Sequence, residues 1–226
     1  MRTQKAVLLI LTCLLIALGA SPPRVAAQQP AGGSPPWDRK NRDTWQRPEE
    51  AMNRLGIQSG SRVADVGCGD GYFTYHLASR VGPSGKVYAV DIRENQIQDI
   101  RRHAAEKSLW QIETIVGAPD DPQLPTSMLD AVLVVDAYHE FKEYDAMLKH
   151  LYDALKPGGV FGVMDFFAEP GQTRAEYVAR HHIPPEMVQQ EVESEGFHFA
   201  RREADIPVPS APWKSFYFLV FTKPTP

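Results

Sequence analysis

The sequence of 226 residues has only two cysteines, Cys13 and Cys68. Cys13 lies in an apolar segment near the N-terminus, so a domain that begins after this segment keeps one cysteine. It therefore cannot form an intramolecular disulfide, which excludes a small disulfide-stapled scaffold. Cys13 follows Leu11-Thr12, with no small residue immediately before it, and this argues against a lipoprotein cysteine.

Long apolar runs are also missing. The longest, residues 6–20, has 15 residues, whereas a membrane span needs about 20. It follows a start with two basic residues and no acid, and it precedes Val25-Ala26-Ala27, a small-residue cleavage site. This pattern is typical of a secretory signal peptide. We expect cleavage after residue 27, no stable membrane span afterwards, and a periplasmic or secreted domain; the alternative is an uncleaved anchor at residues 6–20.

Basic charge is sparse as well. The formal net charge of the chain is −4, and removal of residues 1–27 takes away three basic residues and no acid, which gives −7. The remaining lysines and arginines are scattered, and none forms a basic stripe interleaved with aromatic residues. We therefore expect no nucleic acid as partner or substrate.

What remains is enough for one domain. Residues 28–43 begin with Gln, Pro, Ala, Gly and Ser, and we interpret them as a linker before a domain at residues 44–226. Residues 48–55 are predicted to form a helix that starts at a proline followed by two acids. This segment is either a covering helix, or it brings Trp45 and Arg47 over a ligand pocket.

Apolar runs and helical patterns alternate along this domain. Such alternation predicts an α/β fold with a parallel sheet and helices on both faces, that is, a doubly wound sheet. No helical pattern separates the last two strands, so they are expected to form a hairpin that makes strand 7 antiparallel. The seven strands are predicted at residues 62–66, 86–91, 112–116, 129–136, 160–166, 197–203 and 213–222. The helices are predicted at 72–81, 93–107, 141–155 and, in two pieces, 173–195.

The segment Val63-Ala64-Asp65-Val66-Gly67-Cys68-Gly69-Asp70-Gly71 joins the first strand to a helix. Its glycines follow the spacing G-x-G-x-G, whereas a dinucleotide turn has G-x-G-x-x-G. Tyr72 occupies the place of the third dinucleotide glycine, and no P-loop motif is present. The carboxylate of Asp65 would repel a pyrophosphate and favour a cationic ligand.

Asp91 ends the second strand, where an acid can accept hydrogen bonds from ribose hydroxyls. Two acids beside a tight glycine turn describe a ligand that has a ribose and a positive charge but no phosphates. S-adenosylmethionine, with its sulfonium, ammonium, ribose and adenine, meets this description.

Three motifs resemble those of the class I S-adenosylmethionine-dependent methyltransferases. The glycine segment resembles the first motif of that family, Ala89-Val90-Asp91-Ile92 its second-strand motif, and Leu155-Lys156-Pro157-Gly158-Gly159 the turn before its fifth strand. The resemblance covers roughly residues 45–223. It implies a seven-stranded Rossmann-like fold, S-adenosylmethionine as cofactor and methyl transfer as activity.

The resemblance also implies roles for single residues. Asp65, Gly67 and Gly69 would lie along the methionine moiety, with Cys68 between the glycines as a small filler. Asp91 would bind the ribose, and Ile92 would pack on the adenine.

Two further positions follow from the same resemblance. Asp120 or Asp121 would hold the adenine amino group, although Gly117-Ala118-Pro119 departs from the common Gly-Asp-Ala order. Asp136, at the end of strand 4, would contact the methionine end and the acceptor.

Methyl transfer needs a base when the acceptor must lose a proton. His139 is the candidate, with Tyr138 as a second catalytic candidate, because both follow strand 4, at the sheet edge where reacting groups gather in such folds. The alternative is that His139 or Tyr138 only shapes the pocket wall. A metal site is suggested by His181, His182 and Glu186, but Pro184-Pro185 breaks the helical spacing between them, so these side chains need not share one face. We therefore interpret the histidines as a surface pair and predict no metal site.

Three functions are compatible with these residues. The first is methylation of a small-molecule acceptor. The second is cofactor binding without catalysis, because S-adenosylmethionine is made in the cytoplasm and the chain carries an export signal. The third, a nicotinamide-dependent oxidoreductase, is disfavoured by the glycine spacing.

Overall fold

The computed structural model describes residues 42–208 and 211–226. The predicted signal peptide, the alternative anchor and nearly all of the predicted linker lie outside these residues. Within the described residues, no helix is long and apolar enough to cross a membrane.

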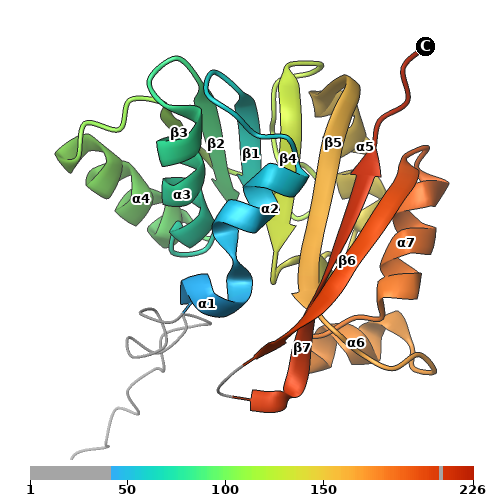
Figure 1. Ribbon diagram of the computed structural model, residues 1–226. Coiled ribbons are helices and arrows are strands. Elements are labelled where there is room, and N and C mark those ends of the chain that lie inside the picture. Colours follow the sequence, from blue (N-terminus) through green and yellow to red (C-terminus); the bar gives the residue numbers. More distant parts are fainter. Residues whose placement is uncertain (1–41, 209–210) are drawn as a thin grey trace, which may run out of the picture. The chain divides into compact units, whose positions relative to one another are not determined.

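The domain is built on one sheet with the order β3-β2-β1-β4-β5-β7-β6 (Figure 1). Its strands are β1 (Arg62–Val66), β2 (Lys86–Asp91), β3 (Ile112–Val116), β4 (Leu129–Val135), β5 (Leu155–Phe166), β6 (His198–Val208) and β7 (Ala211–Thr222). The strands β1 to β5 pair in parallel, and β7 runs antiparallel to both β5 and β6. The predicted doubly wound sheet and its antiparallel strand 7 are therefore confirmed.

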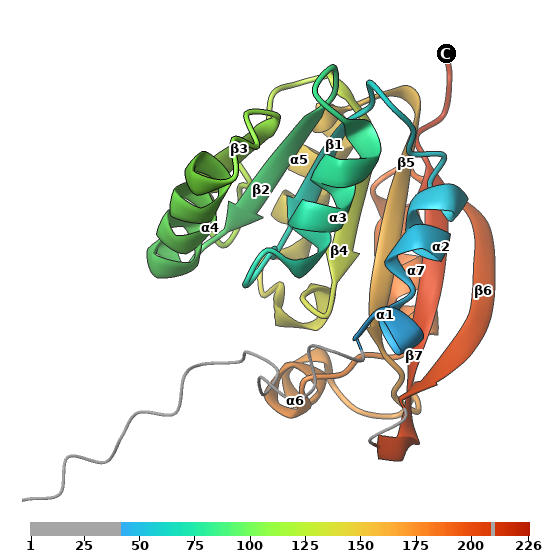
Figure 2. The same ribbon diagram turned by 60° about the vertical axis from the view of Figure 1, so that its left-hand side comes forward.

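Helices cover both faces of the sheet. They are α1 (Arg42–Gln46), α2 (Pro48–Arg54), α3 (Tyr72–Val81), α4 (Glu94–Glu106), α5 (Tyr144–Ala154), α6 (Arg174–Arg180), α7 (Pro185–Ser194) and the 3₁₀ turn η2 (Tyr138–Glu140). Figures 1 and 2 show α2, α3 and α4 on one face and α5 and α7 on the other. The central strand β4 is buried on both sides, as its uninterrupted apolar run predicts.

Both faces are held by apolar packing. On the α5 and α7 face, Leu148, Leu151 and Val188 join Val132 and Val134 of β4. On the α2 and α3 face, the core includes Met52, Phe73, Leu77, Val63 and Leu133. Burial of each large aliphatic side chain contributes about 1.5–3 kcal/mol, so these two layers fix the strand ends that carry the site.

Three segments differ from the predicted elements. β5 begins at Leu155, inside the segment predicted as a turn, because Leu155 pairs with Leu129 before the register shifts to Ala131 and Val160. The helix predicted from residue 141 begins at Tyr144, because the preceding chain turns through η2, where Tyr138 and His139 are buried by tertiary contacts. β6 continues to Val208, beyond its predicted end at 203, because Ile206 and Pro207 pair with β7. Pairing across a long hairpin outweighs the local turn signal of the prolines.

Two short helices lie at the carboxyl end of the parallel strands, α1 from the N-terminal side of the domain and α6 after β5 (Figures 1 and 2). Helix α1 begins at Arg42, which the sequence places in the linker. This edge of the sheet also carries Asp65, Asp91, Asp136 and His139, and it is where ligands bind in open α/β folds.

Candidate active site

The glycine turn after β1 is fastened to β2. The N–H groups of Gly67 and Cys68 donate to the carbonyl of Val90 at 2.8 and 3.0 Å. Gly67 has φ +76°, and a Cβ placed on it would meet the Cβ of Ala137 at 2.4 Å. Only glycine fits this position, because Ala137 packs closely against it and its φ is positive.

Asp91 lies beside this turn, 5% exposed. Its carboxylate accepts four hydrogen bonds: from the N–H of Gly69 at 2.9 Å, and from the N–H, Nε and Nη2 of Arg93 at 2.9, 3.0 and 3.1 Å. Burial raises the pKa of Asp91, but the bonds and charge of Arg93 and the Gly69 bond outweigh it, and the net pKa lies below its ordinary value. Asp91 is therefore a fixed negative charge at the turn.

Asp65 is the second acid of the turn, and it is 2% exposed. The hydroxyl of Thr74 on α3 donates to its Oδ2 at 2.6 Å. Burial raises the pKa of Asp65 to about 7, although the Thr74 hydrogen bond lowers it and the nearby charge of Asp91 raises it further. A cationic ligand beside this carboxyl would favour its ionised form.

This raised pKa gives a pH-dependent affinity. Because the ionised form of Asp65 attracts a cation, affinity for S-adenosylmethionine is expected to rise with pH by up to about tenfold per unit below pH 7 and to level off above it. Calorimetric titration between pH 5.5 and 8.5 measures this. Asp65→Asn should flatten the profile, and an unchanged profile in that variant would contradict the assignment.

Two further predicted positions near the glycine turn are Cys68 and Ile92. Cys68 is buried with Ala89, Ile97 and Ile100, and burial raises the pKa of its thiol well above the ordinary value. This burial agrees with the prediction that its side chain is a small filler. The side chain of Ile92 is apolar and 59% exposed, as the adenine-packing prediction requires.

The adenine-binding acid stays a prediction. Asp121 is engaged in its own loop, where its Oδ1 accepts the N–H of Gln123 at 2.7 Å and lies 3.8 Å from Nδ1 of His150. Asp120 is exposed next to it, so Asp120 is the better candidate of the two.

Helix α1 lies on the glycine turn. Nη1 of Arg42 is 3.4 Å from Oδ1 of Asp70, and the guanidinium lies 4.2 Å from the centroid of the Tyr72 ring. The Tyr72 hydroxyl donates to Asp43, whose Oδ1 also lies 3.4 Å from Nε2 of His76. These contacts, which sequence reasoning missed, place α1 beside the cofactor turn.

Trp45 and Arg47 have different environments, one buried and one exposed. The Trp45 ring is buried with its centroid 5.2 Å from that of Phe216 on β7. Arg47 is exposed and pairs with Glu50 at 3.4 Å. The structure thus favours the covering interpretation for these two side chains.

A buried histidine–carboxylate pair lies at the ends of β4 and β5. Nδ1 of His139 is 2.9 Å from Oδ1 of Asp165, and the His139 N–H donates to Oδ2 of the same residue at 3.1 Å. His139 is 2% exposed and Asp165 is fully buried. A buried carboxylate accepts a proton-bearing nitrogen, so Nδ1 carries the proton and Nε2 is the basic nitrogen of the neutral ring.

The charge of this pair favours proton binding. Burial alone would lower the pKa of His139, but the hydrogen bond and charge of Asp165 raise it above its ordinary value. Asp165 did not emerge from the sequence, where it is one acid between Met164 and Phe166 in an apolar strand. An isolated acid at the carboxyl end of an otherwise apolar strand was the available signal.

Asp136 joins the same cluster. Its backbone has φ +53°, and its N–H donates to the carbonyl of Met164 at 2.8 Å. Its side chain is exposed, and its carboxylate lies within 4.8 Å of the polar atoms of His139 and Asp165. The structure therefore brings Asp136 and His139 together, and Ala137 between them contacts the glycine turn at Gly67.

Tyr138, next to His139 in the sequence, has its hydroxyl bonded to α7. Its side chain is fully buried, and its hydroxyl donates to Oε2 of Glu191 on α7 at 2.9 Å. Burial and the charge of Glu191 raise the pKa of this hydroxyl well above the ordinary value. The structure does not support the catalytic prediction for Tyr138, which anchors η2 to α7.

The chain after α6 carries the two histidines, His181 and His182, and then Glu186. Glu186 forms an ion pair with Arg202 at 3.4 Å and does not join the histidines. His181, however, reaches back to the site, with its Nδ1 3.3 Å from Nε2 of His139. His181 is exposed, as its interpretation as a surface histidine requires, and it also contacts the buried His139.

These positions fit S-adenosylmethionine. The turn has no room for a Cβ at Gly67, two buried acids flank it, and an exposed apolar side chain follows the second acid. Asp65, Gly67, Gly69, Asp91 and Ile92 would hold the cofactor. Two of the four hydrogen bonds on Asp91 come from the Arg93 side chain, which would have to move aside for ribose hydroxyls.

Comparisons with known proteins point the same way. Residues 63–159 match the family model described as a methyltransferase domain. Demethylmenaquinone methyltransferase of Geobacillus sp. (strain WCH70) is 33% identical over 111 residues, which are 49% of this chain and 47% of that protein. The chain thus spans about half the length of the first curated relative.

Solved structures share the fold. A SAM-dependent methyltransferase from Aquifex aeolicus aligns with a TM-score of 0.68 and 21% identity, over 84% of this chain and all of the other. Phosphoethanolamine N-methyltransferase 2 of Haemonchus contortus, in complex with S-adenosyl-L-methionine, aligns with a TM-score of 0.66 and 17% identity, over 80% and 53% of the two chains. Residues 63–159 are thus similar to methyltransferase domains, and the domain shares its fold with known S-adenosylmethionine-dependent methyltransferases.

Proposed function

We propose that this protein methylates a small-molecule acceptor, with His139 as the general base. The observation that carries the proposal is the His139–Asp165 pair, which lies next to Asp136 at the sheet edge that holds the glycine turn. A buried carboxylate that holds an imidazole in one tautomer is the usual arrangement of a catalytic base.

In this mechanism the chain's own residues orient the reactants and accept a proton. When bound, S-adenosylmethionine supplies an electrophilic methyl group on a sulfonium. The acceptor gains that methyl group and loses one proton, which Nε2 of His139 takes up while Asp165 stabilises the resulting imidazolium. Fixed positioning at the carboxyl ends of β4 and β5 contributes in addition, on the order of 7–11 kcal/mol in favourable cases.

The named activity of the relatives suggests where to look for the acceptor. Demethylmenaquinone is a small molecule, and this chain matches part of enzymes named for its methylation. An acceptor with an acidic hydroxyl or ring C–H would require the base that His139 provides. We therefore infer a small-molecule acceptor of this acidity class, with demethylmenaquinone as the first compound to test.

The experiment is transfer of a labelled methyl group from S-adenosylmethionine to demethylmenaquinone, catechols and phenols. Label in one acceptor and release of S-adenosylhomocysteine support the proposal. Tight cofactor binding without transfer to any acceptor would support the alternative, a cofactor-binding protein without catalysis. Binding of NAD in place of S-adenosylmethionine would contradict both.

We also propose that the domain acts outside the cytoplasm. The support is the sequence of residues 1–27, with basic residues, an apolar run and a small-residue site. Mass spectrometry of protein from the periplasmic fraction should give a mature N-terminus at Gln28. An intact Met1 in the membrane fraction would instead support the anchor at residues 6–20.

A further inference from the structure

Two imidazoles and one carboxylate meet where η2 passes the end of α6. Nε2 of His139 lies 3.3 Å from Nδ1 of His181. Oε1 of Glu140 lies 3.6 Å from that Nδ1 and 3.9 Å from that Nε2. His139 is buried at the base of the group, whereas Glu140 and His181 are exposed, so an ion could enter from solvent.

These separations fit the ligands of one metal ion. Two nitrogens that each bind a tetrahedral zinc at about 2.0–2.1 Å lie about 3.3–3.4 Å apart. The imidazole pair has this spacing, at 3.3 Å. The two longer separations both involve Glu140, whose exposed side chain can approach by rotation.

The tautomer of His139 also suits metal binding. Asp165 accepts the Nδ1 proton of His139, so the lone pair of Nε2 points toward His181. A carboxylate behind a ligating histidine is the usual outer support of protein zinc sites, where it fixes the tautomer and raises the basicity of the ligand. Two imidazoles and a carboxylate select zinc and neighbouring transition metals over magnesium or calcium.

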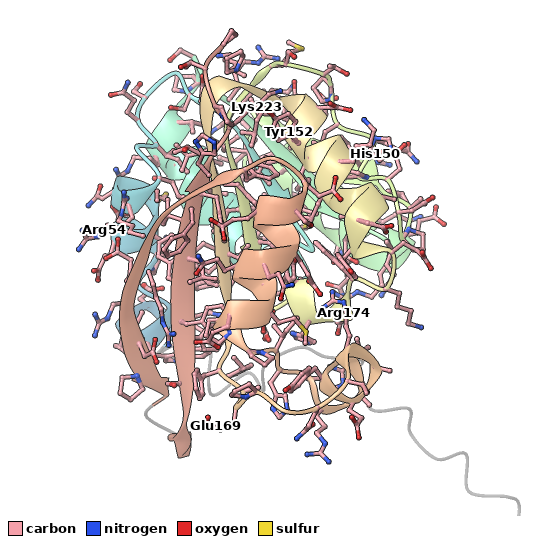
Figure 3. All side chains as sticks on the ribbon, turned by 90° about the vertical axis from the view of Figure 1, so that its right-hand side faces the viewer. Arg54, His150, Tyr152, Glu169, Arg174 and Lys223 are labelled. Carbon is pink, nitrogen blue, oxygen red and sulfur yellow. The ribbon has the colours of Figure 1, made fainter. Side chains whose placement is uncertain are left out.

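The fold holds the two halves of the group together. His181 ends α6 with φ +54°. Arg174, at the start of α6, donates from Nη2 to the carbonyl of Phe141 at 2.7 Å and lies 4.5 Å from the centroid of the Tyr144 ring. Figure 3 shows Arg174 beside α6 at the lower end of the domain. Arg174 is thus a positioning residue that keeps α6 against η2.

We propose that His139, Glu140 and His181 bind one divalent transition-metal ion of the zinc class, with a fourth position open to water. This site rests on geometry and does not require the proposed function. A consequence does rest on the proposed function: the metal would occupy Nε2 of His139, the nitrogen that accepts the proton, so zinc is expected to inhibit methyl transfer.

The test uses the full mature protein after treatment with a chelator. Calorimetric titration with zinc chloride should show one bound equivalent, and cobalt(II) should give the visible absorption of a tetrahedral complex. His181→Ala and Glu140→Gln should each weaken zinc binding at least tenfold. His150→Ala is the matched control, because His150 is a histidine on the outer surface of α5 (Figure 3), and it should leave binding unchanged.

Equal zinc affinity in the wild type, His181→Ala and Glu140→Gln would overturn the proposal and leave a plain hydrogen bond between two imidazoles. Both substituted side chains are exposed, so these variants are expected to fold. The two proposals fail separately. Zinc binding without any methyl transfer would remove only the proposed function, and methyl transfer without zinc binding would remove only the metal site.

Discussion

Replacing His139 by alanine is expected to lower the turnover of methyl transfer by about 10²–10⁴-fold, the usual contribution of a general base. Affinity for S-adenosylmethionine should change little, because Asp65, Asp91 and the glycine turn are intact. Turnover is measured with the labelled cofactor and the acceptor identified in the screen, and cofactor affinity by calorimetry.

Chemical rescue by imidazole distinguishes a general base at position 139 from a residue with only a structural role. The variant leaves a space of imidazole size beside Asp165, so imidazole added to the buffer should restore part of the activity. A chelator is present throughout to remove metal ions. His150→Ala should keep wild-type turnover. If His139→Ala retains wild-type turnover, the base assignment is wrong; if turnover and cofactor affinity fall together without rescue, His139 only shapes the pocket.

Asp91→Ala is expected to weaken binding of S-adenosylmethionine by about 30- to 1,000-fold. Hydrogen bonds to a charged group contribute about 1.5–3 kcal/mol each, and the net loss is reduced because Arg93 already competes for the same carboxylate. Calorimetric titration of the variant with the cofactor and with S-adenosylhomocysteine measures the loss.

Removing Asp91 also leaves the N–H of Gly69 without its acceptor, so thermal unfolding must be followed in parallel. Asp99→Ala serves as the matched control, since Asp99 is an exposed acid that pairs with Arg102 on α4. Unchanged cofactor affinity in a folded Asp91→Ala variant would refute the ribose assignment.

The cofactor half of the site could be predicted because its determinants are local. A strand, a G-x-G-x-G turn and a helix are adjacent in the chain, and β1, β2 and β3 have the predicted bounds. Asp65 and Asp91 follow from their places at strand ends. Parallel strands bring their carboxyl ends to one edge, so the meeting of these residues follows from topology.

The acceptor half depends on contacts between distant segments. Asp165 comes to His139 only because β5 pairs with β4, and His181 arrives through α6, more than 40 residues after His139. Tyr138 and His139 are neighbours in sequence, yet one is bonded to α7 and the other to β5. No periodicity distinguishes these two environments, so the sequence could not separate Tyr138 from His139, and Asp165 is missed.

The pairing of Arg93 with Asp91 has a consequence for exchange. In this structure the Asp91 carboxylate accepts four hydrogen bonds, as many as its four lone pairs allow. Ribose hydroxyls at Asp91, as predicted, would replace hydrogen bonds from Arg93, so their binding would gain less free energy than the formation of new bonds alone. Arg93 would compete with these hydroxyls for the Asp91 carboxylate, and we therefore expect S-adenosylhomocysteine to dissociate readily.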